Sequence, residues 1–322
     1  MSRVVGVPAA RVADAPRRLV HALSVDVEDW NNAVVLWIGG RVVPPTAAVV
    51  RNTERMIELI EGHGLRATWF VLGEVAATFP GLVRRLVKGG HEIGVHGYHH
   101  HRIHDLGRDA FRESIRRAKA VVEDAAGGQV KGYRAVAMSL TRATWWAYEV
   151  LIEQGFEYSS SVMPSRVARH GFPEAEVGVH SVRLAGGHLL EVPLTVVSIA
   201  GVRIPAAGGG YLRHLPGWFS RWSLKRLERE RRPAVVYLHP YELDCEAELR
   251  ETTVGLDAHV RRRIEKLVPS QIRGRQHTIT KLRALFGRFR FAPISTVFAE
   301  QLTASAPAAR GETPEPAGVP CR

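Results

Sequence analysis

The sequence predicts an α/β protein in which helices cover a parallel sheet, built either as a barrel or as a doubly wound open sheet. Three observations support this prediction. Short apolar segments alternate with longer segments whose apolar residues recur at helical spacing. The length of 322 residues allows one domain of barrel size or two smaller ones. Ionisable side chains also follow four of the predicted strands, as they often do in parallel α/β folds.

The first half of the chain contains three predicted strands and two predicted helices. The strands span residues 19–25, 66–72 and 91–96, and the helices span residues 47–60 and 80–87. Pro80 stands at the first position of its helix and Gly89 follows its end, which is the usual placing of these two residues. The apolar run at residues 33–38 has only the length of a strand.

The second half continues the alternation. Helices are predicted at residues 108–126, 141–154 and 218–232, strands at 130–133, 156–160 and 234–238, and β-hairpins at 181–205. We expect one barrel over residues 19–245 with a basic helical extension packed on it at 246–300. Residues 1–18 are expected to be flexible, and residues 301–322, rich in Ala, Pro and Gly, are expected to be disordered.

The composition is that of an ordinary globular protein, with 45% hydrophobic and 24% charged residues. It excludes a fibrous chain and a small disulfide scaffold. No apolar run approaches the roughly 18 residues that a membrane span needs. Cys245 and Cys321 are too few to build a disulfide framework or a zinc ribbon. The first residues lack the pattern of a secretory signal, so we expect a cytoplasmic protein.

The chain is strongly basic, with a formal net charge of +12. Much of the excess lies at residues 221–232, 261–263 and 273–290. Such a charge can attract an acidic glycan, nucleic acid or anionic lipid. Solvated helix faces are the simpler explanation and the one we favour. No zinc finger or RNA-binding signature accompanies the charge, so no nucleic-acid partner is predicted.

Three acidic residues, Asp26, Glu28 and Asp29, follow the first predicted strand. Because side chains alternate along a strand, Asp26 and Glu28 share one side. Paired carboxylates suit a metal ligand and a general base. A helix cap or a turn is the alternative, but three acids within four residues favour a functional role.

Two histidines, His96 and His100, follow the strand predicted at residues 91–96. On a helical turn, this spacing places both imidazoles on one face, where they can bind one divalent metal. With one carboxylate they form a two-histidine, one-carboxylate site that has open positions. A histidine-rich surface loop is the alternative, and the acids upstream favour the metal site.

His239 and Arg134 follow two further strands. Beside a metal site, His239 is a candidate general acid rather than a core histidine. Arg134 is a candidate partner for the base carboxylate, with a plain surface arginine as the alternative. Trp30 adjoins the acids and is a candidate for stacking against a sugar.

In combination these motifs resemble the polysaccharide deacetylases, carbohydrate esterase family 4, with the NodB-homology fold. The resemblance covers roughly residues 19–298. Four motifs carry it, namely Asp26-Val-Glu-Asp, His96-x-x-x-His100, Gly132-Tyr-Arg134-Ala and Leu238-His239-Pro240. The segments at residues 208–216 and 237–244 resemble the subgroup linked to exosortase-type exopolysaccharide systems.

The resemblance implies a distorted (β/α) barrel that removes N-acetyl groups from the amino sugars of a polysaccharide or lipid-linked glycan with the help of a divalent metal. It implies Asp26 as base, His239 as general acid, Arg134 as the residue that orients the base, and His96 with His100 as metal ligands. Zn²⁺ is the expected metal, with Co²⁺, Ni²⁺ and Fe²⁺ as alternatives. The expected substrate-binding residues are Trp30, Tyr133, Ala135 and Tyr241. Peripheral contact with an anionic membrane, at the inner face of the inner membrane, is a further hypothesis.

Three positions depart from the family pattern. Val27 stands where relatives carry a second Asp, so Glu28 or Asp29 must supply the metal carboxylate, and strand alternation favours Glu28. Val136 stands where many relatives carry Pro, and Ser159 where they often carry Asp. Two other functions stay open, namely a metal amidase on a small amide and a non-catalytic glycan-binding module.

Overall fold

The structure is a computed structural model that describes residues 19–168, 171–245 and 255–305. Its centre is a nine-stranded sheet. The strands that follow one another across it are β10 (Val235–Leu238), β1 (Val20–Val27), β2 (Thr68–Val71), β3 (Glu92–Val95), β4 (Gly132–Tyr133), β5 (Tyr158–Ser159), β7 (Gly187–Glu191) and β6 (His180–Leu184). All neighbours are parallel except β7 and β6. The predicted α/β fold with a parallel sheet is therefore confirmed.

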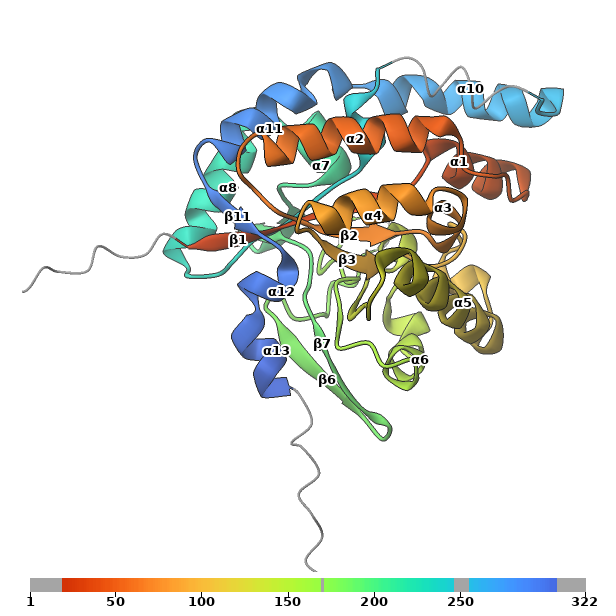
Figure 1. The fold of residues 1–322 in the computed structure, drawn as a ribbon. Coiled ribbons are helices and arrows are strands. Elements are labelled where there is room, and N and C mark those ends of the chain that lie inside the picture. The colour runs from red at the N-terminus through yellow and green to blue at the C-terminus, as the bar shows by residue number, and fades with distance from the viewer. Residues whose placement is uncertain (1–18, 169–170, 246–254, 306–322) are drawn as a thin grey trace, which may run out of the picture.

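Helices surround the strands (Figure 1). Those of the first half are α1 (Trp30–Gly39), α2 (Ala47–Glu61), α3 (Gly73–Thr78), α4 (Pro80–Lys88), α5 (Arg108–Ala126) and α6 (Ala147–Glu153). Those of the second half are α7 (Gly209–His214), α8 (Gly217–Arg229), α10 (Ala258–Ile272), α11 (Thr278–Phe286), α12 (Ile294–Val297) and α13 (Ala299–Ser305). No helix among the described residues combines the length and the apolar character that crossing a membrane requires.

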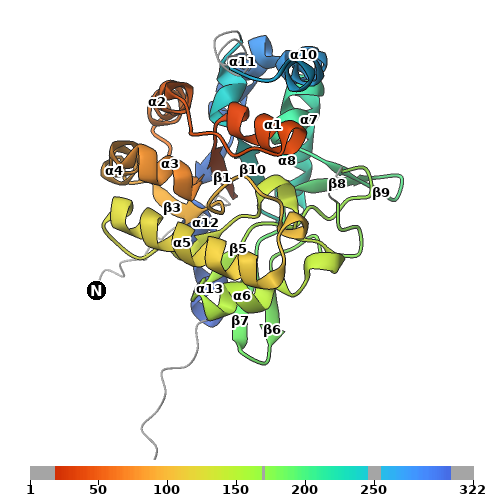
Figure 2. The same ribbon diagram turned by 90° about the vertical axis from the view of Figure 1, so that its right-hand side faces the viewer.

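Shorter elements complete the fold. Five 3₁₀ turns are η1 (Ile103–Asp105), η2 (Val136–Met138), η3 (Arg142–Thr144), η4 (Pro240–Leu243) and η5 (Arg275–His277). A separate hairpin consists of β8 (Val196–Ile199) and β9 (Val202–Pro205), and β11 (Arg290–Ala292) pairs in parallel with β1. In Figure 2 the β8–β9 hairpin projects from the side of the molecule.

The seam of the barrel, between the β7 side and β10, is closed by a side chain. The hydroxyl of Thr195 accepts a hydrogen bond from the Val235 N–H at 2.6 Å and donates one to the Val235 carbonyl at 3.0 Å. Gly208 adds a single parallel bridge to Tyr237. These side-chain hydrogen bonds and the single bridge join β10 to the segment after β7, with no regular strand pairing between β10 and β7 in the described sheet.

The apolar residues form two layers, as expected for a barrel. Leu23, Val25 and Val27 of β1 pack in the outer layer between the sheet and the helices. Alternate positions face inward, so Ala22 belongs to the inner cluster. The inner cluster also contains Phe70, Tyr158, Leu190, Val235, Ile294 and Phe298.

Two glycines leave room for large rings inside the barrel. A Cβ atom at Gly94 would lie 2.4 Å from the Phe70 ring, and one at Gly132 would lie 2.2 Å from the Tyr158 ring. Both distances are far below van der Waals contact, so only glycine fits beside these aromatic residues.

Three expectations about the elements are wrong. Residues 33–38 are part of α1 rather than a strand. Val34 and Val35 follow Trp30 by about one helical turn, and the three side chains pack together against Ile264 of α10. The helix expected at 141–154 is divided into η3 and α6.

The third correction concerns residues 246–300, which are not a purely helical extension. Strand β11 lies within the sheet, and Ile294 and Phe298 fill the barrel interior. The backbone N–H of Ile294 donates to the Thr68 hydroxyl at 2.8 Å. The expected flexible N-terminus at 1–18 lies outside the described residues, as does the part of the expected disordered tail from residue 306 onward. The expectation of disorder is wrong for residues 301–305, which belong to α13.

Two buried histidines should make the fold sensitive to acid. His21 Nδ1 accepts the Ala234 N–H at 3.0 Å, and His91 Nδ1 accepts the Ala67 N–H at 3.2 Å. Burial lowers the pKa of each from 6.5 to about 4. Below pH 6.5 the unfolded chain therefore binds protons that the folded chain does not. We expect the free energy of unfolding to fall between pH 6.5 and 4, by at most about 1.4 kcal/mol per pH unit for each histidine.

Urea unfolding at pH 7 and pH 5 tests this expectation. His91→Gln should show a smaller decrease than the wild type, whereas His63→Gln, at an exposed position, should not differ from it. Equal decreases in all three proteins would contradict the assignment.

Candidate metal centre and active site

The carboxyl ends of β1, β3, β4 and β10 meet at one cavity of about 200 Å³. These ends lie on the right in Figure 1, where α1 and α3 begin after β1 and β2, and they face the viewer in Figure 2. The cavity is lined by Asp26, Glu28, Trp37, His96, His100, Ala137, Met138, Met163, Ala168, Tyr211, Tyr237, His239 and Tyr241. It therefore contains the acids and histidines that the sequence predicted to converge.

A candidate metal centre lies in this cavity. Glu28, His96 and His100 are buried and offer three ligand atoms within 4.8 Å of one another. Glu28 Oε2 lies 2.5 Å from His100 Nε2 and 3.2 Å from His96 Nε2. Burial alone would raise the pKa of Glu28, but His100 and His96 outweigh it and hold that pKa well below its ordinary value.

The donor set fits a divalent cation. His96 Nδ1 lies 2.9 Å from the Arg134 carbonyl oxygen, which can only accept, so this nitrogen carries the proton. His96 Nε2 is then unprotonated, and its lone pair faces Glu28, as in many metal sites. Glu28 Oε2 is buried and makes no hydrogen bond within the described part of the chain. An orphaned carboxylate oxygen between two imidazoles is the arrangement that a metal ion satisfies.

The loop that carries both histidines is not the helical turn expected from their spacing. Gly97 has a φ of +88°, a left-handed conformation that interrupts any helix after His96. The N–H groups of Gly73 and Glu74 donate to the carbonyls of Gly97 and Tyr98 and so anchor the loop on α3. The loop, rather than helical periodicity, brings the two imidazoles together.

Asp29 is not part of the candidate metal centre. Its Oδ2 accepts hydrogen bonds from the Thr46 N–H at 2.6 Å and from the Thr46 hydroxyl at 2.7 Å. Thr46 in turn caps α2 by accepting the Ala48 N–H. Of the two carboxylates that the sequence left open, Glu28 lies with the histidines and Asp29 fixes the start of α2.

Asp26 is paired with Arg134 by a fully buried ion pair. Arg134 Nη1 lies 2.8 Å from Asp26 Oδ1, and both side chains are buried. The same nitrogen donates to the Ser24 hydroxyl at 2.8 Å. Arg134 Nε and Nη2 donate to the carbonyl and hydroxyl of Ser160. Ser160 rather than Ser159 thus supports the guanidinium, and Ser159 donates to Ser161 instead.

His239 faces the acids from β10. Its Nε2 lies 3.8 Å from both Asp26 Oδ2 and Glu28 Oε1. On its other side, Nδ1 lies 3.6 Å from Glu242 Oε1. Burial alone would lower the pKa of His239, but Glu242, Glu28 and Asp26 together raise it from 6.5 to about 9. The ring stacks on Tyr241, with centroids 5.0 Å apart and an interplanar angle of 14°.

Three of the four expected substrate-binding residues do not line the cavity. Trp30 is buried among Val34, Val35 and Ile264. Tyr133 is buried in the outer layer, and the N–H of Ala135 is used by the Ser161 hydroxyl at 2.8 Å. Tyr241 does line the cavity.

Trp37, rather than Trp30, is the tryptophan that lies at the cavity. It lines the cavity with 37% of its surface exposed. Its indole N–H donates to the His100 carbonyl at 3.2 Å, and its ring lies 4.8 Å from the His100 ring. Trp37 lies seven residues after Trp30, about two helical turns along α1, which brings it beside His100 at the cavity.

The turn after Arg134 is strained. Ala137 and Met138 line the cavity and have φ values of +51° and +54°, a conformation that residues with a Cβ atom rarely adopt. Strained backbone of this kind tends to occur at functional sites. The turn begins at Val136, where many relatives carry Pro.

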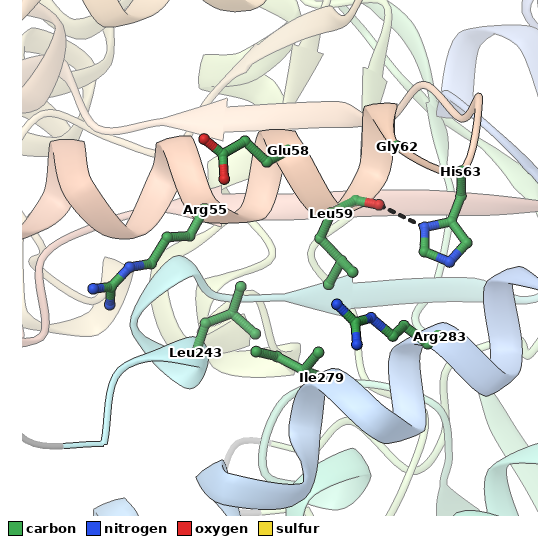
Figure 3. Close-up of a pocket in the computed structure, with 8 residues that line it drawn as sticks. All are labelled: Arg55, Glu58, Leu59, Gly62, His63, Leu243, Ile279 and Arg283. Atoms are coloured by element: carbon green, nitrogen blue, oxygen red, sulfur yellow. Dashed lines mark hydrogen bonds between the residues drawn. The ribbon is translucent and has the colours of Figure 1, made fainter.

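A larger cavity, of about 530 Å³, lies away from this site between α2 and α11. Figure 3 shows Arg55 and Leu59 of α2, with His63 of the turn that follows it, opposite Ile279 and Arg283 of α11. None of the residues of the candidate metal centre lines it. Its size alone therefore does not make it the candidate active site.

Comparison with known proteins supports the identity of the fold and site. Residues 44–156 match the family model of polysaccharide deacetylases, and residues 160–299 match a domain of unknown function, DUF3473. The site draws on both parts, because His96, His100 and Arg134 lie in the first and His239 and Tyr241 in the second.

Two curated relatives are named peptidoglycan deacetylases. The chain is 28% identical to the peptidoglycan-N-acetylglucosamine deacetylase of Bacillus cereus over 147 residues, which are 42% of this chain and 53% of that protein. It is 29% identical to the peptidoglycan deacetylase of Helicobacter pylori over 114 residues, 34% of this chain and 36% of that protein. The chain thus spans about half or less of these relatives.

Two solved structures share the fold. A Mycobacterium smegmatis protein described as a polysaccharide deacetylase is 19% identical, with a TM-score of 0.54 over 95% of this chain and 99% of that one. PuuE allantoinase is 14% identical, with a TM-score of 0.56 over 91% of this chain and 92% of that one.

The fold and the site together define a distorted (β/α) barrel with a two-histidine, one-carboxylate centre at the carboxyl ends of its strands. More particularly, residues 44–156 are similar to the polysaccharide deacetylases, and residues 160–299 are similar to the DUF3473 domain.

The Arg134–Asp26 pair should be costly to break. Arg134→Met leaves the Asp26 carboxylate buried without a partner, so we expect the free energy of unfolding to fall by about 3–5 kcal/mol. Adding Asp26→Asn should recover part of this loss, because the uncompensated charge is removed. Urea unfolding measures both.

The control is Arg116→Met, which breaks an exposed ion pair with Glu113 and should change stability little. If Arg134→Met were no more destabilising than Arg116→Met, the buried pair would not have the importance assigned to it.

Proposed function

We propose that the protein is a metal-dependent hydrolase that removes N-acetyl groups from the amino sugars of a polysaccharide or lipid-linked glycan. The observation that carries this proposal is the convergence of the Glu28, His96 and His100 cluster with Asp26 and His239 in one cavity. The match to the polysaccharide deacetylase model supports the reaction class.

Glu28, His96 and His100 would hold the metal. Two imidazoles and one carboxylate suit Zn²⁺, with Co²⁺, Ni²⁺ and Fe²⁺ as alternatives. When bound, a divalent cation would lower the pKa of a water molecule and polarise a carbonyl oxygen. The arrangement leaves coordination positions open toward the cavity, which catalytic centres need and purely structural ones do not.

Asp26 and His239 would move the protons. Asp26 Oδ1 is held by Arg134, so Oδ2 is the oxygen that accepts a proton from the attacking water. The water oxygen adds to the acetamide carbonyl and the C–N bond then breaks. His239, 3.8 Å from Asp26 Oδ2, donates its Nε2 proton to the departing amine. The products are acetate and a free amino sugar, and the reaction needs no covalent enzyme intermediate.

Two aromatic residues would contact the sugar. Trp37 and Tyr241 both line the cavity, Trp37 beside His100 and Tyr241 stacked on His239. Trp37 is partly exposed and is fixed by its hydrogen bond to the His100 carbonyl. Flat aromatic faces of this kind suit the apolar face of a sugar ring. Neither ring would be needed for a small amide, so their position favours a glycan.

The biological setting rests on the subgroup resemblance. A role in exopolysaccharide biosynthesis is supported by the match of residues 160–299 to DUF3473. The cytoplasmic location stays a prediction.

The reaction is tested by acetate release from N-acetylhexosamine oligomers and bacterial exopolysaccharides. We expect release that a chelator abolishes and that added Zn²⁺ or Co²⁺ restores. Ammonia release or ring opening from small amides, without acetate from any glycan, would favour the amidase instead. Glycan binding that survives both chelation and Asp26→Asn, without turnover, would indicate a binding module.

The metal centre is tested by metal content after dialysis, independently of turnover. Glu28→Gln and His100→Ala should lose the metal, because each removes one of three protein ligands. Asp26→Asn should keep the metal and lose turnover.

Two matched controls accompany these variants. Asp29→Asn and His104→Ala should retain the metal, since Asp29 is bonded to Thr46 and His104 lies on the surface. Loss of metal from His104→Ala but not from His100→Ala would instead indicate adventitious binding by the histidine-rich loop.

A further inference from the structure

The outward face of α8 is unusual for a solvent-exposed helix. The opposite face is buried in the core through Phe219, Leu224 and Leu227. On the outward face, Trp218 has 60% of its surface exposed, and Trp222 follows one turn later, partly exposed. Exposed tryptophans that recur on one helix face are the signature of contact with another surface rather than with water.

Basic residues share this face with the tryptophans. They lie three, seven, eight and eleven positions after Trp218, on the same side of the helix, and they are Arg221, Lys225, Arg226 and Arg229. Glu228 is the single acidic residue within α8. Arg226 lies 5.6 Å from the Trp222 ring centroid and pairs with Glu230 just beyond the helix. The face is therefore both aromatic and positively charged.

The β8–β9 turn adds an aliphatic tip beside this helix. Ile199 and Val202 are paired across the turn and have 38% and 47% of their surfaces exposed. Ala200 and Gly201 between them both have positive φ values, which gives a tight two-residue turn. Figure 2 shows the hairpin projecting from the molecule. The turn and the start of α8 together line a cavity of about 460 Å³.

We propose that this surface, formed by the outward face of α8 and the β8–β9 turn, binds the protein peripherally to a membrane with anionic lipids. Tryptophan rings prefer the boundary between lipid headgroups and acyl chains. Arginine and lysine beside them are complementary to lipid phosphates, and the aliphatic tip reaches the acyl boundary. The sequence placed the membrane contact in the basic C-terminal region, and the structure places the fitting combination of residues on α8.

A glycan fits this surface less well. The cavity is lined by Ser198, Ile199, Ala200, Gly201, Trp218, Phe219, Trp222 and Arg226. Binding sites for sugars combine aromatic rings with placed polar groups that bind the hydroxyls. Here the lining offers no carboxylate or amide side chain, and the projecting tip carries aliphatic side chains only.

The proposal does not depend on the deacetylase assignment. The surface shares no residue with the cavity of the candidate active site. Membrane binding and turnover can therefore succeed or fail separately, and variants of this surface leave the metal ligands, Asp26 and His239 untouched.

Co-sedimentation of the full chain with lipid vesicles tests the proposal. We compare neutral phosphatidylcholine vesicles with vesicles that also contain phosphatidylglycerol, at low and high salt. The wild type should bind the anionic vesicles, and high salt should weaken this binding. Trp218→Ser combined with Val202→Ser should bind about tenfold more weakly. Arg221→Glu combined with Lys225→Glu should lose binding by a similar factor.

Two control variants separate this surface from others. Trp145→Ser removes a tryptophan of 38% exposure from η3–α6, and Arg262→Glu reverses an exposed charge on α10. Both should bind like the wild type. Unchanged thermal midpoints would show that all variants are folded.

Three results would overturn the proposal. The first is no binding of the wild type to anionic vesicles at low salt. The second is loss of binding in Arg262→Glu with full binding by the α8 variants, which would move the contact to α10. The third is binding of N-acetylglucosamine oligomers that disappears in Trp218→Ser while vesicles are ignored, which would make the surface a glycan subsite.

Discussion

The arrangement of the site depends on one buried guanidinium. The side chain of Arg134 holds Asp26, and its carbonyl oxygen accepts the proton of His96 Nδ1. One residue therefore orients the base and also sets the tautomer of a metal ligand. Ser24 and Ser160 accept three further hydrogen bonds from it, so a charge that would be costly in the barrel interior is bonded through all three of its nitrogens. A displaced Arg134 side chain would disturb Asp26, and a displaced Arg134 backbone would disturb His96.

Much of the site follows from strand geometry and was predictable. Alternation along β1 places Asp26 and Glu28 toward the cavity and Val27 in the outer core. Position 27, where relatives carry an acid, therefore accommodates the apolar side chain of Val27. What sequence spacing could not show was the backbone between His96 and His100, since the left-handed Gly97 replaces the expected helical turn. Proximity in sequence also misled the choice of Trp30.

The fold was predictable where signals are local and unpredictable where they are not. Helix α5 has the bounds that its apolar spacing and Gly127 indicate, because helix caps act over a few residues. Strand β11 has only three residues, and its partner β1 lies about 270 residues earlier in the chain. No sequence pattern within Arg290–Ala292 indicates this pairing. The same holds for the Thr195 hydroxyl that closes the seam, whose bonds to Val235 are purely tertiary.

The position of β1 has a consequence for synthesis on the ribosome. Strand β1 is made first, but two of its partners, β10 and β11, begin only at Val235 and Arg290. Ala22 pairs with Val235 of β10 on one side and with Ala292 of β11 on the other, so these strands lie on opposite edges of β1. The edge that β10 covers therefore has unpaired backbone groups throughout most of translation, and such an edge can recruit other chains. The segment that matches the deacetylase model, residues 44–156, contains neither β1 nor β10, and β10, which ends this exposure, lies within the DUF3473 match at residues 160–299.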